Sequence, residues 1–516
     1  MRQHVLFLII AGFSLLPLGC ASLPKNVQRT PSVSIPADPT TEISRNIRSK
    51  LKMHDGLSAF HALFSGEDAF ISRVTAIRAV ERSLDLQYYI WNNDLTGKIL
   101  VEETLKAADR GVRVRILLDD LNLGPHEKVL RHMAMHPNID IRMVNPFAHR
   151  NLRFMDFFTL NKIDKRMHNK VFVADGEIAI VGGRNIGDEY FWASNEMNFG
   201  DLDLWAIGPV VPALSHQFDT YWNAEISYPI ESLTENFNPT EQDYADFRNN
   251  SKSETKKATK TEYIQNLIKN ESENPFITGN LKLYWATAQV IFDPPEKFDQ
   301  KDNEQSNNLQ SQISPFMKNS RQEILMISPY FVPGDDGVEA LKKKVEAGTR
   351  ITVLTNSLAS GDVAVVFSGY KGYRKDLIKG GLALYELKPK DHKNLVKKKK
   401  SLGSSSSHAG LHGKTLVFDR KKILVGSMNL DPRSVYLNTE VGVIIDSPEM
   451  AEQFSAQFEE NLPEIAYQLG LNEKSALTWT TYENGVKETF TSEPETSWWQ
   501  RAKASMLSWV VPERQL

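Results

Sequence analysis

The chain has 516 residues, of which 41% are hydrophobic and 24% charged, a size and balance that suggest two or three domains with ample core. The 61 Lys and Arg residues nearly balance the 64 Asp and Glu residues, which leaves a net charge of −3. A global basic field of the kind that binds nucleic acid is therefore lacking, and no nucleic-acid partner is expected. The single cysteine, Cys20, excludes an intrachain disulfide bond.

Residues 1–20 follow the plan of a bacterial lipoprotein signal peptide. An apolar run over 5–18, short for a membrane span, ends at Cys20, which would become the lipidated N-terminus. Pro17 stands where such sites usually carry Leu, and the alternative is an ordinary signal peptide or an uncleaved anchor. A diacyl anchor would hold an exported, periplasm-facing protein at a membrane surface. Ala21 instead of Asp after the cysteine favours the outer membrane over the inner one.

The chain after the signal peptide divides into five parts. We predict a tether rich in Pro, Ser and Thr at 21–55, an N-terminal domain at 56–230, a polar linker or insertion at 231–280, a C-terminal domain at 281–470, and a hairpin with a Trp-rich helix at 471–516.

The N-terminal half alternates strands and helices. The predicted elements are a helix over 70–83, a strand over 84–91, a helix over 97–110, strands over 112–120, 139–144 and 201–208, and a helix over 212–223. A strand, a helix and a second strand with a short return indicate a right-handed parallel crossover. The polar part that follows contains one predicted helix, over 260–270.

The C-terminal half repeats this order at an offset of nearly 244 residues, which indicates duplication of a whole domain. Its predicted elements are strands over 323–332, 350–356 and 382–387, helices over 336–346, 370–379 and 448–460, and a hairpin over 477–491. The basic, Ser-rich residues 388–410 form either a solvated loop or a contact for anionic lipid. The helix that carries Trp498, Trp499, Leu507 and Trp509 either packs against the body or lies in a membrane interface.

One pattern, H-x-K-x4-D-x6-G-[GS]-x-N, occurs in both halves. The candidate catalytic residues are therefore His168, Lys170 and Asp175 in the first copy and His412, Lys414 and Asp419 in the second, with Asn185 and Asn429 closing the motifs. Each Lys lies two residues after its His at the start of a predicted strand, so both side chains project from one face. Two copies could then place two imidazoles and two ammonium groups around one pocket.

This set of groups suits phosphodiester chemistry. Two ammonium groups can neutralise a phosphate and the charge that grows on it in the transition state. One imidazole can attack phosphorus and form a covalent phospho-histidine, while the other protonates the leaving oxygen and then deprotonates the incoming alcohol or water. Lysine charge supplies the electrostatics, so neither a metal nor another cofactor is expected. The symmetric sequence does not choose which histidine attacks.

Carboxylates should orient the second nitrogen of each imidazole. Glu440 follows His412 by 28 residues, and Asp201 follows His168 by 33 residues in the matching place, with Asp203 as the alternative to Asp201. Both motif asparagines could donate hydrogen bonds to phosphoryl oxygens.

The paired motif resembles the signature of the phospholipase D superfamily. The stretches QYYIWNNDLTGKIL, GGRNIGDEYF, DLDLWAIGPVV and DPRSVYLNTEVG make the chain similar, over roughly residues 55–516, to bacterial cardiolipin synthases of the branch without N-terminal transmembrane helices. The resemblance implies two duplicated α/β domains in pseudo-twofold contact, each a mostly parallel sheet flanked by helices, with the site between them. One chain would then supply the whole site, so a monomer could be active.

The resemblance also implies roles and substrates. His168 would be the nucleophile and His412 the acid and base, while Asp175 and Asp419 would hold the motif loops. The reaction would transfer a phosphatidyl group to phosphatidylglycerol and give cardiolipin, with phosphatidylglycerol or phosphatidylethanolamine as donor. The alternatives are a hydrolytic phospholipase D, a phosphodiesterase or nuclease of the same superfamily, and a non-catalytic lipid-binding protein.

Overall fold

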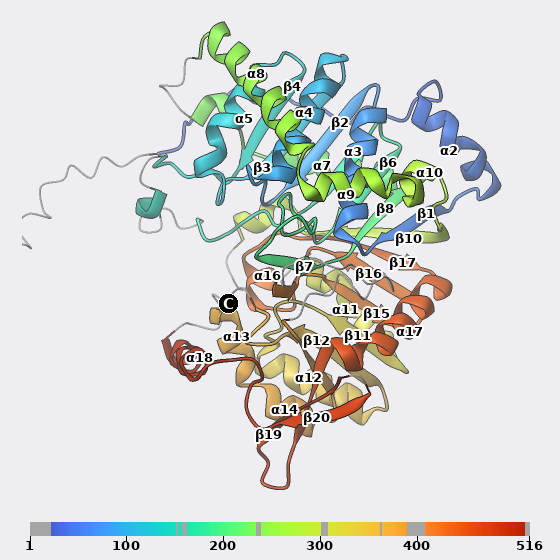
Figure 1. Cartoon of the computed structure of the whole chain (residues 1–516), viewed down its shortest axis with the longest axis vertical. Helices are drawn as coiled ribbons and strands as arrows, with labels where there is room; N and C mark the ends of the chain where they lie inside the picture. Colours follow the sequence, from blue (N-terminus) through green and yellow to red (C-terminus); the bar gives the residue numbers. More distant parts are fainter. Residues whose placement is uncertain are drawn as a thin grey trace, which may run out of the picture.

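The computed structural model describes residues 22–150, 153–156, 163–233, 239–300, 308–361, 364–389, 408–483 and 485–510. Its N-terminal half (blue to green) and C-terminal half (yellow to red) stack on each other along the long axis of the molecule (Figure 1). The predicted signal peptide with Cys20 and most of the basic segment over 388–410 lie outside the described residues.

The sheet of the N-terminal half is built from eight strands. In spatial order they are β1 (Ser58–Leu63), β8 (Asp203–Ile207), β6 (Ile178–Gly182), β5 (Val171–Ala174), β2 (Ser83–Tyr88), β3 (Arg113–Asp119), β4 (Ile139–Val144) and β9 (Ser227–Pro229). Its helices are α2 (Glu42–Met53), α3 (Gly66–Ala79), α4 (Leu95–Asp109), α5 (Glu127–Met133), α7 (Val210–Trp222), α8 (Glu241–Ala258), α9 (Glu262–Lys269) and α10 (Pro275–Thr278).

The sheet of the C-terminal half repeats this order and extends it. Its strands are β10 (Tyr284–Phe292), β17 (Val441–Asp446), β16 (Lys422–Gly426), β15 (Thr415–Phe418), β11 (Glu323–Ile327), β12 (Arg350–Asn356), β13 (Ala383–Leu387), β18 (Ala466–Leu471), β19 (Leu477–Glu483) and β20 (Val486–Phe490). Its helices are α11 (Leu309–Asn319), α12 (Gly334–Glu346), α13 (Ala364–Lys371), α14 (Arg374–Lys379), α16 (Pro432–Tyr436), α17 (Pro448–Ile465) and α18 (Trp498–Val510).

The duplicated α/β architecture is confirmed, but each sheet is mixed and not mostly parallel. Within these two sheets, the parallel pairs among the described strands are β2–β3–β4 and β11–β12–β13, where helices provide the crossovers. After these units each half turns back in a tight hairpin, β5–β6 or β15–β16, and a two-stranded hairpin can only be antiparallel.

The two halves form one continuous structure. Strands β1 and β10 pair antiparallel and join the two sheets, while β7 (Met197–Gly200) and β14 (His408–Leu411) pair in parallel across the junction. Apolar side chains from both sheets, among them Val171 and Val441, pack in a shared core. The pairing and the core hold the two halves in a defined relation, as the site between them requires.

Residues 22–41 lie along the N-terminal half, where the sequence predicts a tether. The buried Arg115 donates from Nη1 to the Ser32 carbonyl oxygen at 3.0 Å, and the Ser34 backbone N–H donates to the Asp219 carboxylate at 2.8 Å. The Arg115 guanidinium also pairs with Asp85 at 2.7 Å. The segment is therefore bound to the body over these residues.

The polar residues after the N-terminal domain are largely helical. Helix α9 falls where the sequence predicts a helix, and α8 precedes it, begun by a capping box at Thr240 and Asp243. The Ser251 hydroxyl donates to the buried Glu102 carboxylate of α4 at 2.6 Å. The helix predicted over 370–379 is divided into α13 and α14, whereas the predicted hairpin is confirmed as β19–β20. Among the described helices, none has the length and apolar character needed to cross a bilayer.

Candidate active site

The two motif histidines lie in short extended segments that lead into β5 and β15, at the junction of the halves. Each histidine is 7% exposed. The sequence predicts strands that begin at the motif lysines, and the regular strands begin one residue later, so both histidines precede them. A backbone bridge between Met167 and Thr439 fixes the first segment against the C-terminal half, since the His168 N–H donates to the Thr439 carbonyl oxygen at 2.9 Å.

Each imidazole is oriented by a carboxylate from the other half. Nδ1 of His168 lies 2.9 Å from Oε2 of Glu440, and Nδ1 of His412 lies 2.5 Å from Oδ2 of Asp201. The predicted carboxylates are therefore the ones in place, but each serves the histidine of the opposite motif. Asp203 is engaged elsewhere, in an ion pair with Arg73 at 2.8 Å. Because a bond at Nδ1 fixes the ring orientation, Nε2 is left for chemistry.

The motif lysines lie beside their histidines. The Lys170 ammonium donates to the His168 carbonyl oxygen at 2.6 Å, and the Lys414 ammonium donates to the His412 carbonyl oxygen. Both lysines are buried. The structure thus gathers the two imidazoles, two ammonium groups and two carboxylates that the sequence singles out.

The two carboxylates are held differently. Glu440 accepts hydrogen bonds from the hydroxyls of Ser427 and Ser434, the latter at 3.0 Å. At the place of Ser427 the first motif has Gly183, and a Cβ there would collide with the Asp201 carboxylate. At the Gly-or-Ser position of the motif, Gly183 packs directly against the Asp201 carboxylate, whereas Ser427 donates its hydroxyl to Glu440.

Burial dominates the electrostatics of the site. Burial, with the Lys414 ammonium beside it, lowers the pKa of His412 to about 4 despite the neighbouring Asp201. Burial and the two motif ammonium groups also place the pKa of His168 well below its usual value. Burial lowers the pKa of Lys170 in the same way. Both imidazoles are therefore neutral near pH 7, which is the form that can attack phosphorus or accept a proton.

The two carboxylates respond oppositely to this environment. Burial raises the pKa of Glu440 to about 7, in spite of the Lys170 ammonium and its hydroxyl donors. Burial also acts to raise the pKa of Asp201, but His412 and Lys414 outweigh it, and the pKa lies below its usual value. The His412–Asp201 pair therefore keeps an ionised carboxylate, whereas Glu440 takes up a proton more readily.

Asp175 and Asp419 contact backbone and neither imidazole. The Asp175 carboxylate accepts from the N–H groups of residues 81, 82 and 83 at 2.8–2.9 Å. The Asp419 carboxylate accepts from residues 321, 322 and 323 at 2.7–3.1 Å. Both residues have φ of 51°, in the left-handed region. Each Asp ties its motif turn to the loop that opens the neighbouring parallel strand.

The motif asparagines lie near the site with unused polar atoms. Oδ1 of Asn185 accepts from the Ile90 N–H at 3.2 Å, while its buried Nδ2 has no hydrogen-bond partner among the described residues. The Asn429 N–H donates to the Ser434 hydroxyl at 3.3 Å, and its buried Oδ1 likewise has no described partner. A buried amide donor without a partner costs free energy, which a phosphoryl oxygen could remove.

The sequence did not single out three residues that the structure brings to the site. The ring of Tyr89 meets His168 edge-on with centroids 5.0 Å apart, and that of Tyr190 meets His412 at 5.1 Å. Arg433, on α16, reaches across the junction and donates to the Asp164 carbonyl oxygen ahead of the first motif. All three lie in stretches that carry the family resemblance, but their residue types alone assign them no chemistry.

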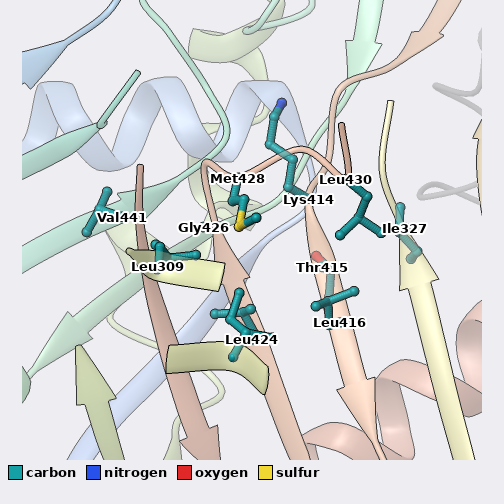
Figure 2. Close-up of a pocket in the computed structure, with 12 residues that line it drawn as sticks. Leu309, Ile327, Lys414, Thr415, Leu416, Leu424, Gly426, Met428, Leu430 and Val441 are labelled. Atoms are coloured by element: carbon teal, nitrogen blue, oxygen red, sulfur yellow. The ribbon is translucent and has the colours of Figure 1, made fainter. Parts of the chain in front are cut away.

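An apolar pocket lies beneath the second motif, between α11 and strands β15–β17 (Figure 2). Its lining includes Leu309, Leu416, Leu424 and Met428. Lys414 stands at its rim. The lining of this pocket is mostly apolar, and the Lys414 ammonium points away from it (Figure 2).

Comparisons with known proteins agree with this geometry. The family described as "Cardiolipin synthase, PLD-like domain" matches residues 74–222 and 313–462. Cardiolipin synthase C of Escherichia coli (strain K12) is 37% identical over 460 residues, covering 89% of this chain and 96% of its own. A cardiolipin synthase of Geobacillus sp. (strain WCH70) is 24% identical over 408 residues, covering 78% of this chain and 66% of its own.

A solved structure shows the same fold. Phosphatidylserine synthase of Haemophilus influenzae Rd KW20 superposes with a TM-score of 0.53 at 14% identity, covering 82% of this chain and 92% of its own. Together with the two matched segments, this likeness accounts for the duplicated halves. The chain belongs to the phospholipase D superfamily of phosphatidyltransferases, among its cardiolipin synthase-like members.

Proposed function

We propose that the protein makes cardiolipin by transferring a phosphatidyl group to phosphatidylglycerol through a covalent phosphatidyl-histidine, without a metal or other cofactor. The observation that carries this proposal is the pairing across the halves, His168 with Glu440 and His412 with Asp201. A neutral imidazole that attacks phosphorus, a second imidazole that carries a proton, and two ammonium groups beside the phosphate are the groups that such a double displacement needs.

In the first step, Nε2 of His168 attacks phosphorus and a P–N bond forms. The bond from phosphorus to the head-group oxygen breaks, and the departing oxygen takes a proton from His412. For this step His412 must carry a proton. Because burial lowers its pKa, the protonated form is a minor one near pH 7, and the ionised Asp201 carboxylate stabilises the imidazolium when it forms. Lys170 and Lys414 stabilise the charge on the phosphoryl oxygens, and Nδ2 of Asn185 supplies a further hydrogen bond.

In the second step, His412 takes the proton from a hydroxyl of phosphatidylglycerol, and the hydroxyl oxygen attacks phosphorus. The P–N bond breaks, cardiolipin leaves and His168 is restored. The donor is either phosphatidylglycerol or phosphatidylethanolamine. If water attacked instead, the same groups would make a hydrolytic phospholipase D, which is the second candidate function, ahead of a phosphodiesterase of the superfamily.

The substrates place the protein at a membrane. We propose that it is exported, lipidated at Cys20 and held facing the periplasm, and that a monomer is active because one chain supplies both halves of the site. Mass spectrometry of the mature N-terminus tests the anchor, since a diacylglyceryl group on Cys20 is the expected finding and an unmodified cysteine contradicts it.

The activity is tested with purified protein in phosphatidylglycerol vesicles, with and without phosphatidylethanolamine, by mass spectrometry of the lipids. Cardiolipin is the expected product, and a rate that depends on phosphatidylethanolamine identifies the donor. Phosphatidic acid without cardiolipin would identify a hydrolase. Equal lipid profiles for wild type and His168→Ala would overturn the lipid chemistry altogether.

A further inference from the structure

The last described helix, α18, exposes large apolar side chains. Trp498, Trp499 and Met506 are 62%, 74% and 67% exposed, higher values than most exposed apolar residues of the described chain reach. The two indole rings meet edge-on with centroids 4.4 Å apart. Leaving this much aromatic surface in water is unfavourable, and such patches mark contacts with a partner or a membrane.

The helix itself is bound to the body. Ala504 is 1% exposed, α18 packs against α13, and the Lys371 ammonium donates to the Ser505 hydroxyl at 2.6 Å. The spacing of a helix then turns Trp499, Lys503 and Met506 to the opposite side, where all three are exposed. The exposed tryptophans therefore belong to a fixed outward face.

The chemistry of this face suits anionic lipid. Residues 498–510 include two cations, Arg501 and Lys503, and no Asp or Glu. Indole rings favour the boundary between hydrocarbon and head groups, and a nearby lysine can meet lipid phosphates. A protein partner would be expected to present pockets for the rings, but a bilayer requires only this combination of aromatic and cationic groups.

The place of α18 in the molecule agrees with this assignment. In Figure 1 the helix and the first described residues (dark blue) both lie on the left side of the molecule. The lipid anchor proposed at Cys20 would precede these residues by two positions in the chain. Two attachments are stronger than one, because the first raises the effective concentration of the second at the surface.

We propose that the outward face of α18, formed by Trp498, Trp499, Lys503 and Met506, docks on the surface of an anionic phospholipid bilayer. This proposal rests on the proposed function, because the lipid substrates of that function lie in the same bilayer. Together with the N-terminal anchor, it fixes the orientation of the catalytic halves relative to the membrane.

A fluorescent probe tests the contact directly. Met506→Cys in a full-length Cys20→Ser background carries one thiol, which takes an environment-sensitive dye. On phosphatidylglycerol-containing vesicles we expect the emission to shift to the blue and lipid-attached quenchers to reduce it. Ile268→Cys on α9, 53% exposed, is the matched control and should show neither change. No change at position 506 while the protein is bound to the vesicles would overturn the proposal.

A second variant separates docking from chemistry. Trp498→Ser with Trp499→Ser should lower the partition into anionic vesicles about tenfold or more, and Ile268→Ser should not. Equal partition of the double variant and wild type would contradict docking. If the probe reports contact but no cardiolipin forms, the proposed function fails and the docking surface stands. If cardiolipin forms without contact, the docking surface fails and the proposed function stands.

Discussion

At the scale of single residues, both halves of the site contain a histidine, a lysine and an orienting carboxylate, but the carboxylates are held by different neighbours. Gly183 gives Asp201 the room to approach His412, whereas Ser427 occupies the matching place and donates a hydroxyl to Glu440. One imidazole thus faces a carboxylate that stays ionised and the other a carboxylate with a raised pKa. The duplicated sequence has therefore diverged at the residues that hold the two orienting carboxylates.

The packing at Gly183 predicts a large effect from a small side chain. Gly183→Ala places a methyl group against the Asp201 carboxylate and should displace it from His412, lowering kcat about 100-fold. Ser427→Ala removes one donor to Glu440 and should cost less than about tenfold. Initial rates of lipid product check both, with thermal midpoints to confirm folding. Equal losses in the two variants would refute the asymmetry.

The raised pKa of Glu440 predicts a link between pH and stability. Its folded pKa, about 7, exceeds the unfolded value near 4.5, so folding favours the protonated form. The contribution of this group to stability is therefore fully present below about pH 4.5 and is lost as the pH rises through about 7. Glu440→Gln removes the ionisation and should unfold at a higher temperature than wild type at alkaline pH.

The measurement is thermal unfolding of wild type and Glu440→Gln at about pH 5 and about pH 8. The unfolding midpoint of the variant, relative to that of wild type, should be higher at about pH 8 than at about pH 5. The activity of the variant should fall, because a carboxamide cannot stabilise a positive charge on His168. Glu449→Gln, on the exposed first turn of α17, is the control and should show no such change. A pH-independent difference would show that Glu440 does not titrate in this range.

At the scale of elements, the motif aspartates connect each hairpin to its parallel unit. Asp175→Ala removes a carboxylate that accepts from three backbone N–H groups, so it should destabilise the protein by about 2–4 kcal/mol. Urea unfolding measures the change, and Asp140→Ala, an exposed position on β4, provides the comparison. An Asp175→Ala variant with wild-type stability but no activity would instead make this Asp a participant in the chemistry.

Most elements can be predicted from the sequence because their signals are local. Strands β4 and β12 have the predicted bounds, and the Asn-Gly pair correctly predicts the β19–β20 hairpin. Strand β7 has no such local signal, because its hydrogen bonds go to β14, more than 200 residues away. Helix α8 escapes prediction because it is polar around most of its surface, and a burial pattern cannot reveal a helix that buries so little.

Most members of the candidate site can be predicted from the sequence, but their connections cannot. Motif spacing identifies the histidines and the lysines, and the strand after each motif supplies Glu440 in one half and either Asp201 or Asp203 in the other. The spacing along one half suggests that each carboxylate serves its own half, yet the structure crosses them. Which imidazole a carboxylate reaches depends on how the two halves meet, and that follows from the pairing of β1 with β10 and from the shared core.

At the scale of the whole molecule, each half supplies the carboxylate that orients the histidine of the other half. His168 needs Glu440 and His412 needs Asp201, so neither half contains a complete acid–base pair. The shared apolar core between the sheets keeps the two halves together within one chain. We therefore expect a single chain to form one complete site.

Mixing two defective variants tests this. His168→Ala and His412→Ala each lack one imidazole, and in a monomeric enzyme every chain of an equal mixture remains defective, so no cardiolipin should form above the level of either variant alone. If two copies exchanged halves, some pairs would contain one site with both imidazoles, and activity would return. Wild type mixed with His168→Ala calibrates the assay, since half the wild-type rate is expected when the chains act independently. Recovery of activity in the variant mixture, together with a dimer in light scattering, would place the working site between two chains.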